Sequence, residues 1–209
     1  MLLHSHSRVV IAFLLNAAQY NIRFQVIVTD TKPSGAGLIT ARILREQGIP
    51  VSVIPDNCVG YVMRKVDTVI MGAEGVVENG GIINAMGTYT IAVLAQQSKK
   101  PFYVLAETHK FVRLFPLDQF DLPVQPRLQG LLDFTTEHVA PFSGNVESLP
   151  ELSSGEKDGE GVQRLGDGRG KGSAPLVDYT RPGFITAIIS EGGVMTPSAV
   201  SEELIKIYS

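Results

Sequence analysis

The sequence contains one cysteine, no long apolar run and no excess of basic residues. The single Cys58 excludes an internal disulfide framework and a metal site built from cysteines, and it is typical of a reducing compartment. The 18 basic and 21 acidic side chains give a formal net charge of -3. No overall positive field is therefore available to hold nucleic acid or an anionic membrane, and we expect proteins or small molecules as partners.

Signals for secretion or membrane insertion are also missing. Met1–Leu3 is followed at once by the polar stretch His4–Arg8, so the apolar core of a signal peptide is absent. No apolar run reaches the roughly 18 to 20 residues that are needed to cross a bilayer. These features predict a soluble protein of the cytosol with no membrane partner.

The sequence lacks the common motifs for nucleotide cofactors. Gly72–Gly75 and Gly80–Gly81 are rich in glycine, but neither makes the pattern G-x-G-x-x-G between a strand and a helix. A Walker motif is absent as well. We therefore expect no nicotinamide, flavin or other cofactor.

Apolar residues alternate between helical and strand spacing along most of the chain. A spacing of three and four residues predicts helices, and short β-branched runs that end at turn residues predict strands. The predicted helices cover residues 7–21, 37–46, 59–65, 88–97 and 197–208. The predicted strands cover residues 24–29, 51–54, 68–71 and 101–106. In the last helix, Thr196 is the expected N-cap and Pro197 the first helical residue.

This order of elements, with continuous apolar strands, predicts an α/β fold: a Rossmann-like parallel sheet with helices on both faces. The length of 209 residues and the 44% hydrophobic content predict a single domain over residues 1–209. Residues 143–175 are dense in glycine, serine and charge, and we predict a disordered insertion there. An RNA-binding Arg/Gly segment is a weaker interpretation because acidic residues are mixed through it.

Polar clusters follow several predicted strands and should meet at one edge of the sheet. The clusters are His4–Arg8, Asp30–Lys32, Glu74 with Glu78–Gly81, and Glu107–Lys110. Hydroxyl and cationic side chains, together with free N–H groups at the start of a helix, could bind a phosphate group. The side chains of this kind are Ser7, Arg8, Lys32 and Lys110. Alternatively, Arg8 and Lys110 only pair with Glu74 and Glu107, and both interpretations remain open.

A metal site is not predicted. His4 and His6 are two residues apart, so an extended segment would place both rings on one face, but no third ligand is evident. Histidines with satisfied hydrogen bonds in a loop are the favoured interpretation. Cys58 has no neighbouring base and is expected to be a small packed residue rather than a nucleophile.

Long stretches of the sequence resemble the family of the alpha subunit of eukaryotic translation initiation factor 2B. They are Met71–Asn84 with Gly87–Thr88, Phe111–Leu117 and Thr196–Ile205. The resemblance covers the chain except for residues 143–175. It implies a Rossmann-like domain that begins within its first strand, without the N-terminal helical domain of the full alpha subunit.

The resemblance also implies a function. The chain would be a regulatory, non-catalytic subunit of the guanine nucleotide exchange factor for initiation factor 2, and it would form a homodimer. Its further partners would be the beta and delta subunits and the phosphorylated alpha subunit of initiation factor 2, which acts in the integrated stress response. Residues 197–208 and 111–117 are apolar candidates for the dimer interface, and burial within the monomer is the alternative.

Isomerases of methylthioribose phosphate and ribose bisphosphate share this fold, and their pattern offers a test of enzymatic activity. The resemblance places Ser5 where these enzymes have a cysteine, Glu74 where they have an aspartate and Ala85 where they have a lysine. A serine hydroxyl needs an adjacent base, which His4 or His6 could provide. Glu74 moves the carboxylate by on the order of 1 Å, and such misplacement can cost ~100-fold in rate.

We therefore expect a degenerate isomerase site that still binds a sugar phosphate or a nucleotide monophosphate. The expected ligand-binding residues are His4, Ser7, Arg8, Lys32, Glu74, Asn84 and Lys110. The alternative is a sugar-phosphate isomerase with an altered active site.

Overall fold

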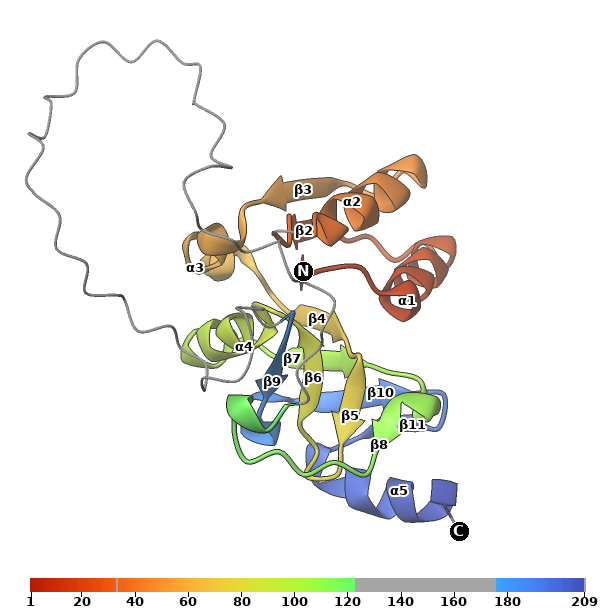
Figure 1. Ribbon diagram of the computed structural model, residues 1–209. Coiled ribbons are helices and arrows are strands. Elements are labelled where there is room, and N and C mark those ends of the chain that lie inside the picture. The colour runs from red at the N-terminus through yellow and green to blue at the C-terminus, as the bar shows by residue number, and fades with distance from the viewer. Residues whose placement is uncertain (33, 123–175, 209) are drawn as a thin grey trace, which may run out of the picture. The chain divides into compact units, whose positions relative to one another are not determined.

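A seven-stranded sheet runs through the part of the chain that the computed structural model describes, residues 1–32, 34–122 and 176–208 (Figure 1). Its strand order is β11-β10-β7-β4-β1-β2-β3. The strands are β1 (Leu2–Leu3), β2 (Val26–Thr29), β3 (Val51–Ile54), β4 (Val69–Gly72), β7 (Phe102–Leu105), β10 (Ala187–Ser190) and β11 (Gly193–Met195). Neighbouring strands are parallel except for the pair β10–β11. The insertion predicted at residues 143–175 lies outside the described residues.

Helices cover both faces of this sheet, as predicted. They are α1 (Arg8–Gln19), α2 (Ala36–Glu46), α3 (Val59–Val62), α4 (Thr88–Gln97) and α5 (Val200–Tyr208). Leu14 of α1 and Leu44 of α2 pack with Val28 in one buried cluster. Val59 of α3 and Ala92 of α4 belong to a second cluster. The α/β class and the Rossmann-like parallel sheet are therefore confirmed.

A second, smaller sheet was not predicted. It has the order β8-β5-β6-β9, with β8 (Phe111–Val112), β5 (Gly75–Val77), β6 (Ile82–Ala85) and β9 (Val177–Thr180). Val76, Ile82 and Phe111 of this sheet share the second buried cluster with Val104 and Ile188 of the large sheet, so the sheets pack together (Figure 1). β5 and β6 lie in a glycine-rich run that resembles a loop, and β8 has only two residues, so these strands carry no clear signal in the sequence.

The C-terminal part differs from the prediction in two details. Residues 187–195 form an antiparallel hairpin at the sheet edge, so the sheet is not wholly parallel. The predicted helix begins with a 3-10 turn over Pro197–Ala199, and α5 follows at Val200. Thr196 makes no capping hydrogen bond, because its hydroxyl pairs with the Ser198 hydroxyl at 2.9 Å. No helix among the described residues is long and apolar enough to span a membrane.

Candidate functional site

Loops that follow β1, β2 and β4 meet at the carboxyl edge of the large sheet, because these strands are parallel neighbours. The Ser5 N–H donates a hydrogen bond to Thr31 Oγ1 at 2.8 Å. Both residues have positive φ angles, 64° for Ser5 and 55° for Thr31. Non-glycine residues in this conformation are strained, and such strain is concentrated at functional sites. We call these loops, together with the loop that follows β7 and the turn Ala85–Gly87 before α4, the strand-end site.

His4 lies inside the protein, below the loop surface where ligand contact was expected. It is 4% exposed, and its Nδ1 and Nε2 lie 2.6 Å from Thr29 Oγ1 and 2.9 Å from the Met86 carbonyl oxygen. A carbonyl oxygen only accepts, so Nε2 carries the proton, and Nδ1 of the neutral ring accepts from the Thr29 hydroxyl. Burial lowers the pKa of His4, although the carboxylate of Asp56 lies 3.7 Å from Nδ1. His4 is the hydrogen-bonded histidine that the sequence favoured.

His6 contacts other residues than His4 does. Its Nδ1 lies 3.2 Å from Thr40 Oγ1, and the Thr40 hydroxyl donates to the Ser5 carbonyl oxygen at 2.9 Å. The two imidazoles therefore bind different partners instead of facing one common point. Within the described ranges, no group of three or more His, Cys, Asp or Glu side chains could hold a metal ion.

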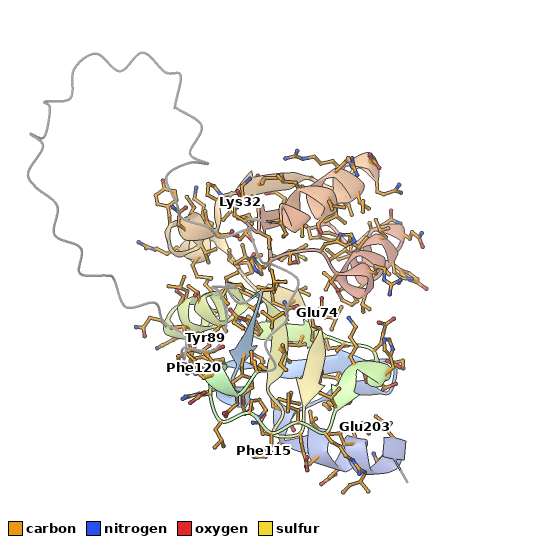
Figure 2. All side chains as sticks on the ribbon, viewed as in Figure 1. Lys32, Glu74, Tyr89, Phe115, Phe120 and Glu203 are labelled. Carbon is orange, nitrogen blue, oxygen red and sulfur yellow. The ribbon has the colours of Figure 1, made fainter. Side chains whose placement is uncertain are left out.

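Lys32 lies on the loop after β2, which a carboxylate of the next strand's loop holds in place. Asp56 accepts from the Thr31 N–H at 3.0 Å and from the Lys32 N–H at 2.7 Å. The Lys32 side chain is exposed, and its Nζ lies 3.9 Å from Asp30 Oδ2. Figure 2 shows Lys32 and Glu74 on separate loops of the strand-end site. The loop backbone is thus fixed while the ammonium group stays accessible.

Ser7 begins α1 and is packed tightly against β4. Its Oγ accepts from the Val10 N–H at 3.4 Å, so Ser7 is the N-cap of α1. A Cβ atom at Gly72 would collide with Ser7 Oγ, so the last residue of β4 must lack a side chain for α1 to start here. The neighbouring Arg8 is exposed at a groove of about 560 Å³ that Glu107 and Glu191 also line.

The side chain of Lys110 binds the backbone next to Glu74. The Lys110 ammonium group donates to the Ala73 carbonyl oxygen at 2.7 Å, one residue before Glu74. The Glu74 N–H donates to the Ile83 carbonyl oxygen at 2.9 Å, while its side chain is exposed. In the described part of the chain, neither Arg8 nor Lys110 forms an ion pair with Glu74 or Glu107. The alternative interpretation, in which Arg8 and Lys110 only pair with Glu74 and Glu107, is therefore wrong.

Asn84 and Ala85 end β6 beneath the strand-end site. Asn84 is 6% exposed, and its Nδ2 donates to Thr88 Oγ1 at 3.0 Å. The Thr88 hydroxyl in turn donates to the Ala85 carbonyl oxygen at 2.7 Å. Asn84 therefore stabilises the start of α4 from a buried position.

One predicted cluster does not belong to the site. Residues 78–81 form the turn between β5 and β6, where a Cβ atom at Gly80 would collide with the Pro197 carbonyl group. Asn79 of this turn donates to Tyr179 Oη at 2.8 Å. The expectation that Glu78–Gly81 lines the site with Glu74 is wrong, because the unpredicted hairpin carries this turn away from the ends of the parallel strands.

Sequence reasoning missed Asp56 and Asp178. Asp56 follows the predicted strand 51–54, so the rule that selected the other loops could have selected it too. Asp178 carries no local signal: it belongs to β9, yet it accepts from the Gly87 N–H at 2.8 Å and from the Tyr89 N–H at 3.0 Å. Residues 91 positions apart meet there only because β9 pairs with β6.

Another groove, of about 860 Å³, lies at the opposite edge of the sheet, where residues 21–25 and 47–50 precede β2 and β3. Arg23 is its one charged lining residue. Most charged side chains of the predicted site lie at the carboxyl edge instead. They are the cations Arg8, Lys32 and Lys110 and the exposed carboxylate Glu74.

Comparison with known proteins identifies the family. A family model described as the initiation factor 2 subunit family matches residues 1–197. The chain belongs to this family. The resemblance that the sequence stretches indicated is therefore confirmed.

Relatives within the family carry different names. Translation initiation factor eIF2B subunit alpha of Dictyostelium discoideum is 43% identical over 209 residues, which is 100% of this chain and 58% of the relative. Ribose 1,5-bisphosphate isomerase of Archaeoglobus fulgidus is 38% identical over 194 residues, 93% of this chain and 53% of that enzyme. The chain thus spans little more than half the length of these relatives.

A solved structure agrees with the fold described above. The translation initiation factor eIF-2B of Pyrococcus horikoshii OT3 superposes with a TM-score of 0.68 at 28% sequence identity. The match covers 94% of this chain and 57% of the solved chain.

Proposed function

We propose that this chain is a regulatory, non-catalytic subunit of the guanine nucleotide exchange factor for translation initiation factor 2. The observation that carries the proposal is the 43% identity, over the full chain, to a protein named eIF2B subunit alpha. In this role the chain forms a homodimer in the cytosol and contacts the beta and delta subunits of the exchange factor. Together with them it responds to the phosphorylated alpha subunit of initiation factor 2.

The geometry around Ser5 supports a non-catalytic role. A serine hydroxyl acts as a nucleophile or proton carrier only beside a base. Both ring nitrogens of His4 are occupied by Thr29 and Met86. Within the described residues, neither His4 nor His6 is hydrogen-bonded to the Ser5 hydroxyl. The lack of a hydrogen-bonded base beside Ser5, which the resemblance places at the position of the isomerase cysteine, supports this part of the proposal.

The strand-end site has cationic side chains that could bind an anionic ligand. Lys32 and Arg8 are exposed cations, and the half-buried Lys110 donates to a neutral carbonyl oxygen, with no carboxylate partner among the described residues. We infer that the site binds the phosphate group of a sugar phosphate or of a nucleotide monophosphate, and that this ligand regulates or stabilises the subunit. Buried His4 and Asn84 act in this proposal by holding the site's backbone, and Ser7 by starting α1.

The subunit role is tested by assembly and exchange. Sedimentation equilibrium of the purified chain should give a dimer, and immobilised chain should retain the beta and delta subunits from a defined mixture of purified subunits. In an exchange assay that lacks the alpha subunit, added chain should change GDP release only when the other subunits are present. A strict monomer that retains neither subunit contradicts the proposal.

A second function is favoured by the 38% identity to ribose 1,5-bisphosphate isomerase. It is isomerisation of a sugar phosphate at an altered site. Conversion of ribose 1,5-bisphosphate by the purified chain, lost in the Glu74→Gln variant, would establish it. Absence of turnover together with retained binding leaves the regulatory role.

A further inference from the structure

Asp178 serves as a distant cap for α4. The N-cap residue of this helix, Gly87, has no side chain, and its φ angle is 107°. The Asp178 carboxylate reaches this end from β9 and accepts from the Gly87 and Tyr89 N–H groups through Oδ2. A carboxylate is the favoured acceptor at a helix N-terminus because free N–H groups and the helix dipole both attract negative charge.

The carboxylate is held in an unusual environment. Asp178 is 4% exposed, and its Oδ1 is buried without a hydrogen-bond partner among the described residues. Burial raises the pKa of Asp178 to about 6, although the bonds from Tyr89 and Gly87 act in the opposite direction. Placing a carboxylate here opposes stability.

The capped turn is also the partner of His4. Met86, between Ala85 and Gly87, offers its carbonyl oxygen to His4 Nε2 at 2.9 Å. A Cβ atom at Gly87 would lie 3.1 Å from His4 Cε1, so the ring packs directly on the turn. The turn is therefore clamped between Asp178 on one side and His4 on the other.

His4 connects the turn Ala85–Gly87 to the strand-end loops by hydrogen bonds. The bond to the Met86 carbonyl oxygen selects the tautomer with the proton on Nε2. In this tautomer Nδ1 accepts from the Thr29 hydroxyl at 2.6 Å. Thr29 Oγ1 lies 3.4 Å from Thr31 Oγ1, and Thr31 Oγ1 accepts from the Ser5 N–H at 2.8 Å. These contacts form a continuous path from β9 to the strained residues of the strand-end site.

We infer that Asp178 is the positioning residue of the strand-end site: it fixes the turn Ala85–Gly87, and through Met86 it sets the tautomer and orientation of His4 and the conformation of the Ser5 loop. The inference rests on the proposed ligand-binding function for its effect on affinity. Its effect on His4 is independent of any ligand.

The test measures both effects in the full chain. The ring signals of His4 in nuclear magnetic resonance spectra, assigned by their loss in His4→Gln, report which nitrogen carries the proton, and the remaining histidines serve as internal references. Calorimetric titration with ribose 5-phosphate and with AMP reports affinity. Asp178→Ala removes the acceptor, and Asp178→Asn keeps an oxygen in its place. Asp67→Asn is the control, since Asp67 is exposed before β4 at the amino edge of the sheet.

We expect Asp178→Ala to shift the His4 signals away from the Nε2-protonated form and to weaken probe binding on the order of tenfold. Asp178→Asn should restore both properties to within about threefold, because its side-chain oxygen can still accept from the turn. Asp67→Asn should change neither. If Asp178→Ala does not fold, Asp178→Ser shortens the acceptor and should shift the same signals.

Unchanged His4 signals in folded Asp178→Ala or Asp178→Ser overturn the inference, and so does a shift of the signals without any loss of affinity in a chain that binds the probe. If the wild-type chain binds neither probe, the proposed ligand fails. The His4 signals then decide the role of Asp178 by themselves: a shift in the variant supports it, and no shift overturns it.

Discussion

The side chain of Asn79 joins the hairpin β5–β6 to β9 by donating a hydrogen bond to Tyr179 Oη at 2.8 Å. The same amide donates to the Pro116 carbonyl oxygen at 3.2 Å, and Asn79 Oδ1 accepts from the Gly81 N–H at 2.9 Å. One side chain thus connects three segments of the small sheet. This sheet forms part of the core, because Tyr179 is 2% exposed.

Asn79→Ala should destabilise the protein by about 2–3 kcal/mol, because three hydrogen bonds are lost and the partners are partly buried. Tyr179→Phe removes only one of them and should cost about 1 kcal/mol. The free energy of unfolding in urea measures both. Asn57→Ala, at an exposed position after β3, is the matched control and should stay within about 0.5 kcal/mol of wild type. Equal losses for Asn57→Ala and Asn79→Ala would contradict the role of the hydrogen bonds.

Gly72→Ala should destabilise the protein by about 1–3 kcal/mol, because the added Cβ would collide with Oγ and Cβ of Ser7. Removing the obstacle with Ser7→Gly should recover part of this loss, so the double variant should be more stable than the sum of the single effects predicts. Thermal unfolding of the four proteins in this cycle gives the coupling energy. Additive effects would show that Gly72 and Ser7 do not interact.

The contributions of Asp178 and His4 to the free energy of unfolding should change with pH in opposite directions. Burial raises the pKa of Asp178 from 3.8 to about 6, so the folded protein takes up this proton before the unfolded chain does. Acidification from pH 6 to pH 4 then raises the contribution of Asp178 to stability, by up to about 3 kcal/mol. Burial lowers the pKa of His4 below 6.5, so its contribution is present above that pH and is lost as the unfolded chain becomes protonated.

Urea unfolding at several pH values between 4 and 7 separates these effects. Asp178→Asn should make the loss of stability on acidification steeper, because the compensating proton uptake is removed. His4→Gln should make it shallower. Identical slopes for wild type and Asp178→Asn between pH 4 and 6 would contradict the raised pKa of Asp178.

Lys32→Ala and Lys110→Ala should each weaken the binding of ribose 5-phosphate on the order of tenfold, because a charge-assisted contact to the phosphate group is lost. Lys65→Ala removes the same charge from the amino edge of the sheet, before β4, and should leave binding unchanged. Calorimetric titration at two salt concentrations measures the effect, which should shrink as salt rises. An equal loss in Lys65→Ala would indicate a general charge effect instead of a site at the carboxyl edge.

Local periodicity predicted those elements whose residues interact mainly with their neighbours in sequence. The strand Val51–Ile54 and the helix Thr88–Gln97 have the predicted bounds. Three β-branched residues before a proline mark the strand, and a ten-residue run with helical spacing marks the helix. β5 and β6 were missed, since three and four residues in a glycine-rich run resemble a loop. Their stability comes from β8 and β9, which lie far away in sequence.

The sequence by itself determined the α/β class, the edge of the sheet at which the polar loops gather, and the family. Each of these depends on patterns within short stretches of chain. The tertiary structure alone decided that His4 is buried, that Lys110 binds a carbonyl group instead of a carboxylate, and that Asp178 caps a helix 91 residues earlier in the chain. The physical reason is that burial and hydrogen-bond partners are set by which strands pair, and strand pairing joins residues whose separation leaves no periodic signal in the sequence.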